Sequence, residues 1–299
     1  MADAPPPAGV SIAEAISQGR RELARAGCEQ ARLDGELLLA AALGVGRERL
    51  ILDHGRTLDP PEHGRYLQAI ERRAAREPVA YILGRRDFRR ITLAVDRRVL
   101  IPRPETELLV EVGLGLPAGA RVADVGTGSG AVALALADER PDLLVRGLDV
   151  SEDALAVARA NARRLGLAAE FAAADLLDGE RYDAVLANLP YIPDGAPLEP
   201  EISLYEPSRA LFAGPDGLDL VRRLIRRVGI GTGVGVGVGV KAGGGVGAAA
   251  GPRPLPLLAL EIGSEQCAEV VGLMRVAGFG TVEVLKDLAG LDRVVVGSA

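Results

Sequence analysis

Residues 121–138, RVADVGTGSGAVALALAD, decide the fold. The short apolar run Arg121–Asp124 predicts a strand, and the apolar run that follows Gly130 predicts a helix. Between them, Gly126, Gly128 and Gly130 allow a tight turn whose backbone N–H groups face a ligand, beside the positive end of that helix. The stretch therefore predicts a strand, a ligand-binding turn and a helix, which together begin an α/β domain.

The alternation of strand and helix continues along the chain. Further strands are predicted at Leu143–Asp149, Tyr182–Ala187, Leu257–Ile262, Val282–Leu285 and Arg293–Val296, and helices at Glu152–Leu165 and about Glu265–Ala277. Strands that alternate with helices in this way favour a parallel sheet with helices on both faces. We therefore expect an α/β, doubly wound architecture for this part of the chain.

The region that precedes it has a helical pattern. Ser11 can cap a first helix, Gly44 can end a second, and Pro60 can open a third. Apolar residues then alternate with polar ones, which predicts a strand pair. We expect a flexible tail at 1–10, a helical bundle at 11–84, a β-hairpin linker at 85–103, and an α/β domain at 104–299 with a low-complexity insertion at 229–255.

The insertion is built mainly of glycine and valine. Glycine at every second position leaves little side-chain surface to pack and a large entropy cost of ordering. We expect Gly229–Gly251 to form a mobile loop without chemistry of its own, with a Val-faced β extension as the alternative.

Composition excludes several classes of protein. Of the 299 residues, 48% are hydrophobic and 25% are charged, and the net charge of −6 gives no basic footprint for non-specific nucleic-acid binding. His54 and His63 are the only histidines, and the two cysteines are isolated, which argues against a histidine triad, a metal site and a disulfide framework. No signal peptide or membrane span is evident, so we expect a cytoplasmic protein without metal or membrane partners.

A carboxylate follows the glycine turn, at the end of the next predicted strand. Asp149 is placed there to accept hydrogen bonds from both hydroxyls of an adenosine ribose. The sequence therefore predicts an adenosine-containing cofactor. Because Gly126, Gly128 and Ala131 also fit the dinucleotide fingerprint, a dehydrogenase stays open on these residues alone.

Residues 187–193, ANLPYIP, indicate the chemistry. A planar NH₂ group, as in glutamine or adenine, has a delocalised lone pair and is a poor nucleophile. The Asn188 side-chain oxygen and the Leu189 backbone carbonyl can accept its two hydrogens and turn its nitrogen toward a methyl sulfonium, while Pro190 fixes the backbone and Tyr191 packs over the substrate. Positioning of this kind is worth roughly 7–11 kcal/mol in favourable cases.

Both motifs resemble those of S-adenosylmethionine-dependent methyltransferases. The glycine turn resembles their motif I, and residues 188–191 resemble their N-P-P-Y motif, with Leu189 where the first proline is usual. The resemblance implies S-adenosyl-L-methionine as cofactor, bound on a doubly wound, mostly parallel seven-stranded methyltransferase sheet that follows a small N-terminal helical bundle. It implies cofactor contacts from Gly126, Thr127, Gly128, Ser129, Gly130, Asp149, Asp175, Leu176 and Asn188, and a substrate site made of Asn188, Leu189, Pro190 and Tyr191.

Three longer stretches narrow the resemblance to one family. PVAYILG at 78–84 with LIPRPETE at 100–107, EPSRALFAGPDGL at 206–218 and KDLAGLDRVVVG at 286–297 are similar to peptide chain release factor glutamine methyltransferases. This resemblance implies N5-methylation of the glutamine in the Gly-Gly-Gln motif of release factors, with the helical bundle docking the factor and no direct nucleic-acid contact. Glutamine methylation of a large-subunit ribosomal protein is the second hypothesis. Adenine-N6 methylation of DNA, a dehydrogenase and a non-catalytic scaffold follow.

Overall fold

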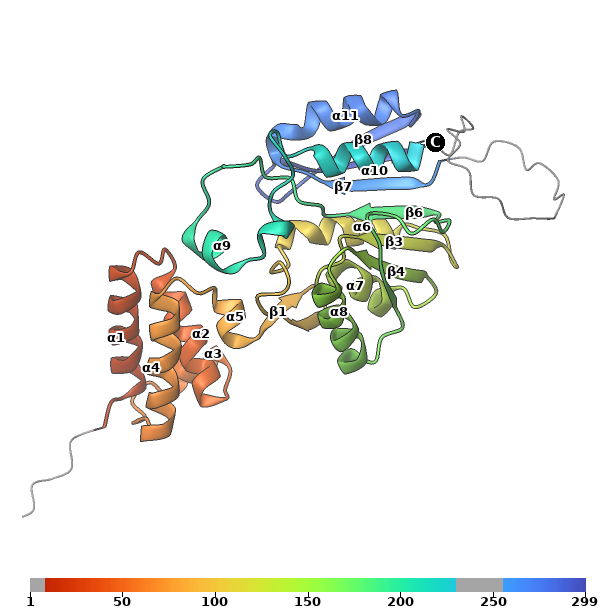
Figure 1. The fold of residues 1–299 in the computed structure, drawn as a ribbon. Helices are drawn as coiled ribbons and strands as arrows, with labels where there is room; N and C mark the ends of the chain where they lie inside the picture. Colours follow the sequence, from red (N-terminus) through yellow and green to blue (C-terminus); the bar gives the residue numbers. More distant parts are fainter. Residues whose placement is uncertain (1–8, 230–254) are drawn as a thin grey trace, which may run out of the picture. The chain divides into compact units, whose positions relative to one another are not determined.

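The computed structural model describes residues 9–229 and 255–299, which form two units (Figure 1). The first unit contains the chain up to Arg85 together with Leu198–Glu206, and the second contains Arg86–Pro197 and Pro207–Ala299. Residues 1–8 of the tail predicted at 1–10, and residues 230–254 of the insertion predicted at 229–255, lie outside the described residues. Gly229, where the insertion was predicted to begin, is instead the last residue of a helix, and the Val10 carbonyl accepts a hydrogen bond from the Leu58 N–H.

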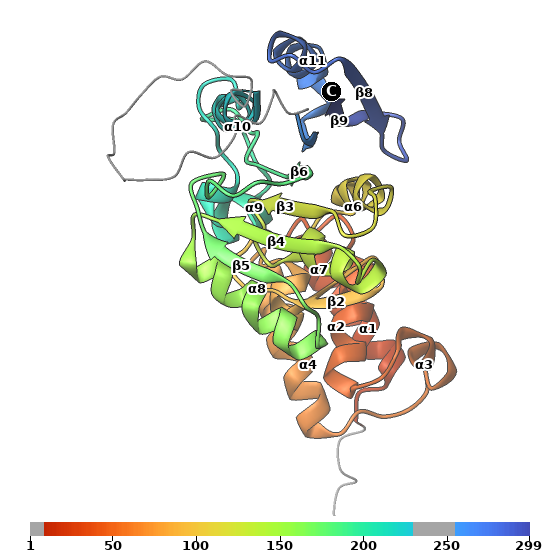
Figure 2. The ribbon, with the colours of Figure 1, turned by 90° about the vertical axis from the view of Figure 1, so that its right-hand side faces the viewer.

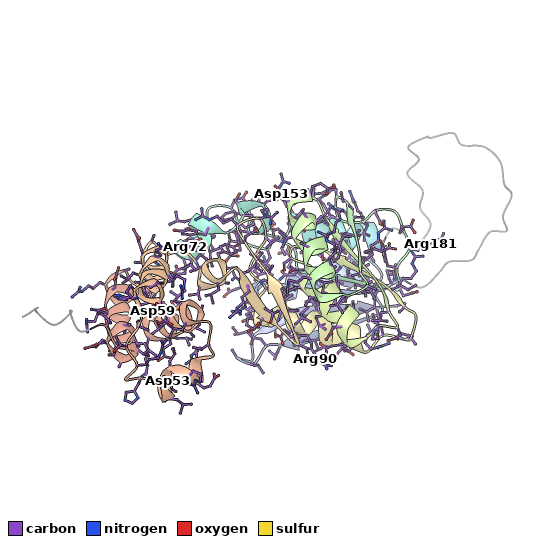
Figure 3. All side chains as sticks on the ribbon, turned by 90° about the horizontal axis from the view of Figure 1, so that it is seen from below. Asp53, Asp59, Arg72, Arg90, Asp153 and Arg181 are labelled. Atoms are coloured by element: carbon purple, nitrogen blue, oxygen red, sulfur yellow. The ribbon has the colours of Figure 1, made fainter. Side chains whose placement is uncertain are left out.

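The first unit is helical. It contains α1 (Ile12–Arg25), α2 (Ala31–Leu43), α3 (Arg47–Leu52), α4 (Pro60–Ala74) and α5 (Val79–Leu83), and the later helix α9 (Pro200–Tyr205) belongs to it as well. Ser11 caps α1, as predicted, and Asp59 (Figure 3) caps α4; in each case a capping box satisfies backbone N–H groups. Gly44, in the left-handed conformation at φ 68°, ends α2 where the sequence predicted.

Buried ion pairs join residues 198–206 to the rest of the first unit. Arg73 donates one hydrogen bond to Asp34 and one to Glu201, both 2.8 Å long, and its side chain is only 8% exposed. Arg76 donates to both oxygens of the Glu201 carboxylate. Burial opposes ionisation of Glu201, but the hydrogen bonds from Arg76 and Arg73 lower its pKa.

The second unit is built on a seven-stranded sheet. Its strands are β3 (Arg121–Val125), β4 (Leu144–Asp149), β5 (Glu170–Ala173), β6 (Ala184–Ala187), β7 (Leu257–Glu261), β8 (Thr281–Lys286) and β9 (Asp292–Ser298). They lie in the order β5-β4-β3-β6-β7-β9-β8, and β9 is antiparallel to both of its neighbours. A separate two-stranded sheet pairs β1 (Arg85–Phe88) with β2 (Ile91–Ala94). The predicted mostly parallel seven-stranded sheet is confirmed.

Helices cover both faces of this sheet (Figure 2). They are α6 (Glu107–Leu114), α7 (Ala131–Glu139), α8 (Glu152–Leu165), α10 (Asp219–Gly229) and α11 (Cys267–Val276), with short 3₁₀ turns at Pro104–Thr106, Ser208–Ala210 and Ser264–Gln266. Alternate residues of a strand face opposite ways. Ala123 and Val125 share a core with α10 and α11, whereas Asp124 accepts a hydrogen bond from α7. None of the described helices is long and apolar enough to cross a bilayer.

The strand order places a topological switch between β3 and β6. From β3 the chain adds β4 and then β5 toward one edge, and it then returns so that β6 pairs with the other side of β3. Val125, at the end of β3, pairs with Leu148 on one side and Ala187 on the other. Loops that leave a parallel sheet in opposite directions at such a point open a crevice in which ligands bind. The glycine turn and residues 188–191 both begin there.

Candidate functional site

A pocket of about 640 Å³ lies at this switch point, entirely within the second unit. Its volume is in the range usual for small-molecule sites. Eight of the residues predicted from sequence line it: Gly126, Gly128, Asp149, Asp175, Leu176, Asn188, Leu189 and Pro190. Thr127, Ser129, Gly130 and Tyr191, which were also predicted, are not among the residues that line it.

The glycine turn requires glycine for two reasons. Gly126, Gly128 and Gly130 all have positive φ, at 76°, 54° and 85°. A Cβ on Gly126 would lie 3.1 Å from the Asn188 carbonyl oxygen, and one on Gly130 would lie 3.0 Å from Leu134 Cδ1. The turn therefore lies directly against the backbone that follows β6, and Gly130 packs the start of α7 closely.

Asp124 holds this turn from beneath. Its carboxylate accepts a 2.6 Å hydrogen bond from the Thr127 hydroxyl and a 3.0 Å hydrogen bond from the Ala133 N–H. Burial raises the pKa of Asp124 to about 6. Thr127 and Ser129 are themselves buried, and the Ser129 carbonyl accepts a hydrogen bond from Asn161 of α8. Alternate residues of the turn thus face the protein, while Gly126 and Gly128 face the pocket.

Asp149 occupies the end of β4, where the ribose carboxylate was predicted. One of its oxygens accepts the Gly128 N–H at 3.0 Å and the other accepts the Ser151 N–H at 2.9 Å. A carboxylate oxygen has two lone pairs, so each oxygen keeps an acceptor position for a ligand hydroxyl. Because both oxygens are oriented by backbone, the carboxylate fits the pair of hydroxyls of a ribose.

The predicted adenine border has a charged part and an apolar part. Asp175 pairs with Arg223 and Arg227 of α10, and its side chain is 55% exposed. Leu176 is buried at φ 71°, in the left-handed region that costs a non-glycine residue roughly 1–2 kcal/mol. Backbone strain of this kind clusters at ligand sites. Val150 adds a second apolar wall, since it lines the same pocket and is 55% exposed.

Asn188 contacts a polar residue that lies outside the pocket lining. Its side-chain Nδ2 donates a 2.9 Å hydrogen bond to Thr106 Oγ1, and the Thr106 hydroxyl in turn lowers the pKa of the Glu261 carboxylate. Glu261 ends β7 and is 1% exposed, and its Oε2 atom has no hydrogen-bond partner. Burial raises the pKa of Glu261 to about 7, against the lowering effects of Thr106 and Arg293.

Sequence reasoning assigned no role to Thr106 or Glu261. Thr106 lies within the quoted stretch LIPRPETE, and Glu261 is an isolated acidic residue in the apolar run Leu257–Ile262. A lone carboxylate at the carboxyl end of a buried parallel strand is a signal that could have identified Glu261, because ligand sites form at that edge.

The surroundings differ among Leu189, Pro190 and Tyr191. Leu189 is buried, and its Cδ2 atom lies 3.3 Å from the position of a Cβ on Gly126. Pro190 lines the pocket. Tyr191 is held by its backbone, since its carbonyl accepts a 3.0 Å hydrogen bond from Gln266, and burial raises the pKa of its phenol.

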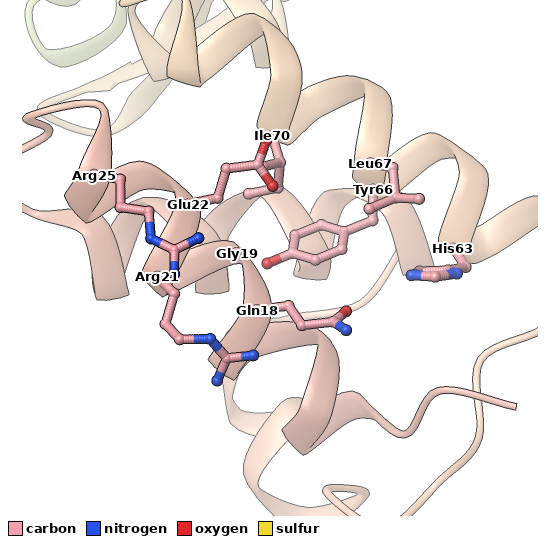
Figure 4. A pocket seen from close by; sticks show the side chains of 9 residues that line it. All are labelled: Gln18, Gly19, Arg21, Glu22, Arg25, His63, Tyr66, Leu67 and Ile70. Carbon is pink, nitrogen blue, oxygen red and sulfur yellow. The ribbon is translucent and has the colours of Figure 1, made fainter. Parts of the chain in front are cut away.

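The first unit has a hollow of its own, of about 490 Å³, between α1 and α4 (Figure 4). It is lined by Gln18, Gly19, Arg21, Glu22, Arg25, His63, Tyr66, Leu67 and Ile70. The Tyr66 hydroxyl donates to the Ala15 carbonyl at 3.3 Å, so it serves packing. These lining residues include no glycine turn, and within the described ranges no group of three or more His, Cys, Asp or Glu side chains is arranged to hold a metal ion. The residues predicted for cofactor and substrate all lie in the second unit.

Known families match both parts of the chain. Residues 14–84 match the PrmC N-terminal domain, and residues 104–200 match the methyltransferase small domain. The release factor glutamine methyltransferase of Moorella thermoacetica is 41% identical over 297 residues, which cover 95% of this chain and 97% of the relative. That of Caulobacter vibrioides is 38% identical over 301 residues, 96% of each chain.

A solved structure shares the fold at much lower identity. The catalytic domain of hMettl16, in complex with the MAT2A 3′UTR hairpin 1, superposes with a TM-score of 0.51 and 16% identity, over 82% of this chain and 83% of that one. This likeness supports the methyltransferase sheet.

Proposed function

This chain belongs to the release factor glutamine methyltransferase family, and from that membership we propose that it methylates a glutamine side chain of a peptide chain release factor with S-adenosyl-L-methionine. We place the reaction at N5 of the glutamine in the Gly-Gly-Gln motif. The observation that supports the proposal is the close approach of Gly126 to Asn188, since the turn proposed for the cofactor and the amide proposed for the substrate then line one pocket.

The residues present fit the cofactor. The glycine turn offers backbone N–H groups, Asp149 offers two oriented carboxylate oxygens, and Val150 and Leu176 offer apolar walls. When bound, S-adenosyl-L-methionine supplies an electrophilic methyl group on a sulfonium. The chain contributes binding and orientation.

Asn188 and Leu189 orient the nucleophile in this proposal. Because the Asn188 Nδ2 group donates to Thr106, the amide oxygen is the part left for a substrate. That oxygen accepts one N–H of the glutamine amide and the Leu189 carbonyl accepts the other. The nitrogen oriented in this way would take the methyl group that the sulfonium supplies, and it would then lose one proton to solvent. No strong base is needed, because an alkylated amide is acidic.

The first experiment is mass spectrometry of a recombinant release factor after incubation with the protein and S-adenosyl-L-methionine. We expect the Gly-Gly-Gln peptide to gain the mass of one methylene group. Cofactor binding without this gain would overturn the substrate and move the proposal to a ribosomal-protein glutamine and then to DNA adenine. Absence of cofactor binding would overturn the enzyme class.

The Asn188→Ala variant tests the acceptor. We expect the rate of transfer to fall by a factor on the order of 10²–10³, by analogy with the removal of one oriented hydrogen-bond partner from a reaction site. Affinity for S-adenosyl-L-methionine, measured by calorimetry, should change little. Full activity of the variant would contradict the orientation mechanism.

The Asp149→Ala variant should have the opposite profile. It removes the carboxylate proposed for the ribose, so cofactor affinity should fall by roughly tenfold or more, since a hydrogen bond to a charged group contributes about 1.5–3 kcal/mol. Calorimetric titration measures this directly. An unchanged dissociation constant would assign the ribose contact to another residue.

The first unit is proposed to dock the release factor, and the cytoplasm is the proposed place of action because the substrate is a protein of translation. The match of residues 14–84 to the PrmC N-terminal domain supports this role, as do the full-length alignments with relatives named release factor glutamine methyltransferase.

A further inference from the structure

We propose that Thr106 and Glu261 are positioning residues that hold the Asn188 amide with its oxygen toward the pocket. The inference rests on the proposed methyl transfer and deepens it, because it says how the substrate acceptor is kept in the productive orientation. Neither residue is among those that line the pocket, so both act through Asn188.

The number of available hydrogens decides the orientation. A threonine hydroxyl has one hydrogen to donate and can also accept, whereas an ionised carboxylate can only accept. In this proposal the Thr106 hydrogen points to the ionised Glu261 carboxylate, whose pKa the hydroxyl lowers, and Thr106 Oγ1 accepts the 2.9 Å hydrogen bond from Asn188. If the Asn188 amide were turned over, its oxygen would face Thr106 Oγ1 with no hydrogen between them. The pair thus selects the arrangement that points the amide oxygen at the substrate.

We call Asn188, Thr106 and Glu261 the relay. It is rigid because its members come from different parts of the sheet domain and are packed tightly. Thr106 precedes α6 and is buried, Asn188 follows β6, and Glu261 ends β7. Strand β6 pairs with β7 in register, with Ala187 beside Leu260. The relay therefore connects neighbouring strand ends.

Glu261 also makes the orientation sensitive to protonation. Tyr191 after β6, Arg293 on β9, and Arg103 and Glu105 before α6 are the titratable and charged groups around it. Arg293 is paired with Asp287 at 2.9 Å. A protonated Glu261 donates its own hydrogen to Thr106, whose hydrogen is then free to turn to Asn188 and favours the reversed amide.

The test compares Thr106→Val, Thr106→Ser and Glu261→Gln. Valine keeps the shape of threonine and removes the hydroxyl, so we expect kcat to fall about ten- to hundredfold, by analogy with residues that orient the ligands of a metal ion. Serine restores the hydroxyl and should return kcat to within a fewfold of the wild type. Glutamine can donate to Thr106, so Glu261→Gln should also lower kcat. The dissociation constant for S-adenosyl-L-methionine should stay unchanged in all three.

Two comparisons separate positioning from a merely structural role. In the wild type, kcat should fall as the pH drops through about 7, and this step should be absent in Thr106→Val and Glu261→Gln. In an Asn188→Ala background, Thr106→Val should cause no further loss, because a residue that acts through Asn188 has nothing left to orient. Thr281→Val and Glu283→Gln on the exposed positions of β8 are matched controls and should behave as wild type.

A readout without turnover keeps this inference separate from the choice of substrate. The Asn188 side-chain amide signals, assigned by their loss in Asn188→Ala, should shift with pH near 7 in the wild type and stay constant in Glu261→Gln. If the amide signals titrate but the release factor is not methylated, the relay is supported and the release factor is overturned as the substrate. Additive losses in the double variant, or signals that ignore pH, would overturn the relay.

Discussion

Glu201 and Glu261 are two largely buried carboxylates with opposite surroundings. Glu201, in the first unit, meets the guanidinium groups of Arg73 and Arg76, and these lower its pKa against the effect of burial. Glu261, in the second unit, has a buried carboxylate oxygen, Oε2, without a hydrogen-bond partner, and burial raises its pKa to about 7.

The difference separates a structural carboxylate from a functional candidate. A buried charge that is fully paired serves to hold elements together, and breaking the pair is costly. A buried carboxylate with incomplete partners titrates near neutral pH, and groups of that kind gather at functional sites. A glutamate thus fixes α9 in the first unit, and another glutamate lies close to the proposed reaction site in the second.

Removing the charge that pairs Glu201 should have the largest effect on stability. Arg73→Met leaves Asp34 and Glu201 buried with fewer partners, so we expect the free energy of unfolding of the first unit to fall by about 3–5 kcal/mol. Urea titration followed by circular dichroism measures this. Arg49→Met, which breaks an exposed pair with Asp53, is the control and should cost at most about 1 kcal/mol. Equal losses of stability in Arg73→Met and Arg49→Met would show that the buried pairs of Arg73 contribute no more than an exposed pair. Glu201 would then not qualify as a structural carboxylate.

Glu261→Gln should change the pH dependence of stability. In the wild type the folded pKa is about 7 and the ordinary value is 4.5, so the folded state binds the proton more tightly. This contribution is complete below pH 4.5 and is lost as the pH rises to about 7, in total about 3 kcal/mol at 1.36 kcal/mol per pKa unit.

The informative window lies between pH 6 and 7. Asp124, whose pKa is raised from 3.8 to about 6, produces a slope of the same sign at lower pH in both proteins. Unfolding titrations should therefore show a decline between pH 6 and 7 in the wild type and a level profile in Glu261→Gln. Parallel profiles would show that Glu261 does not titrate there.

Tyr205→Phe should have the smallest effect. The Tyr205 hydroxyl donates a 2.7 Å hydrogen bond to the Ala75 carbonyl within the first unit. Loss of one such bond costs about 0.5–1.5 kcal/mol. A loss in the urea titration as large as that of Arg73→Met would show that this hydrogen bond, and not the ion-pair cluster, fastens α9.

Local sequence signals predicted the centre of the second unit well. The glycine turn, Asp149 and Asn188 all follow strands, and the register of β3 with β4 and β6 brings them to one edge. What these signals could not resolve is which side of each backbone faces the ligand. Thr127 lies within the turn, yet its hydroxyl is directed to Asp124, because the buried carboxylate needs a donor.

Long-range partners were beyond the sequence pattern. The sequence around Glu201 contains no signal that predicts its contact with Arg73, and the sequence around Glu261 contains none for Thr106. Each contact depends on how distant segments pack. For the same reason the short helix α9 was not predicted, and neither was its membership of the first unit.

That membership has a consequence for the order in which the protein can mature on the ribosome. Arg73 and Glu201 are 128 positions apart, so the last piece of the first unit is synthesised long after its helices. At about 5–20 residues per second, the interval is roughly 6 to 25 s. During that time Arg73 has only Asp34 of its two carboxylate partners, and β3 to β6 emerge before the first unit is complete. Nascent chains stalled before and after residues 198–206 have emerged from the ribosome should therefore differ in the protease resistance of α1 to α4.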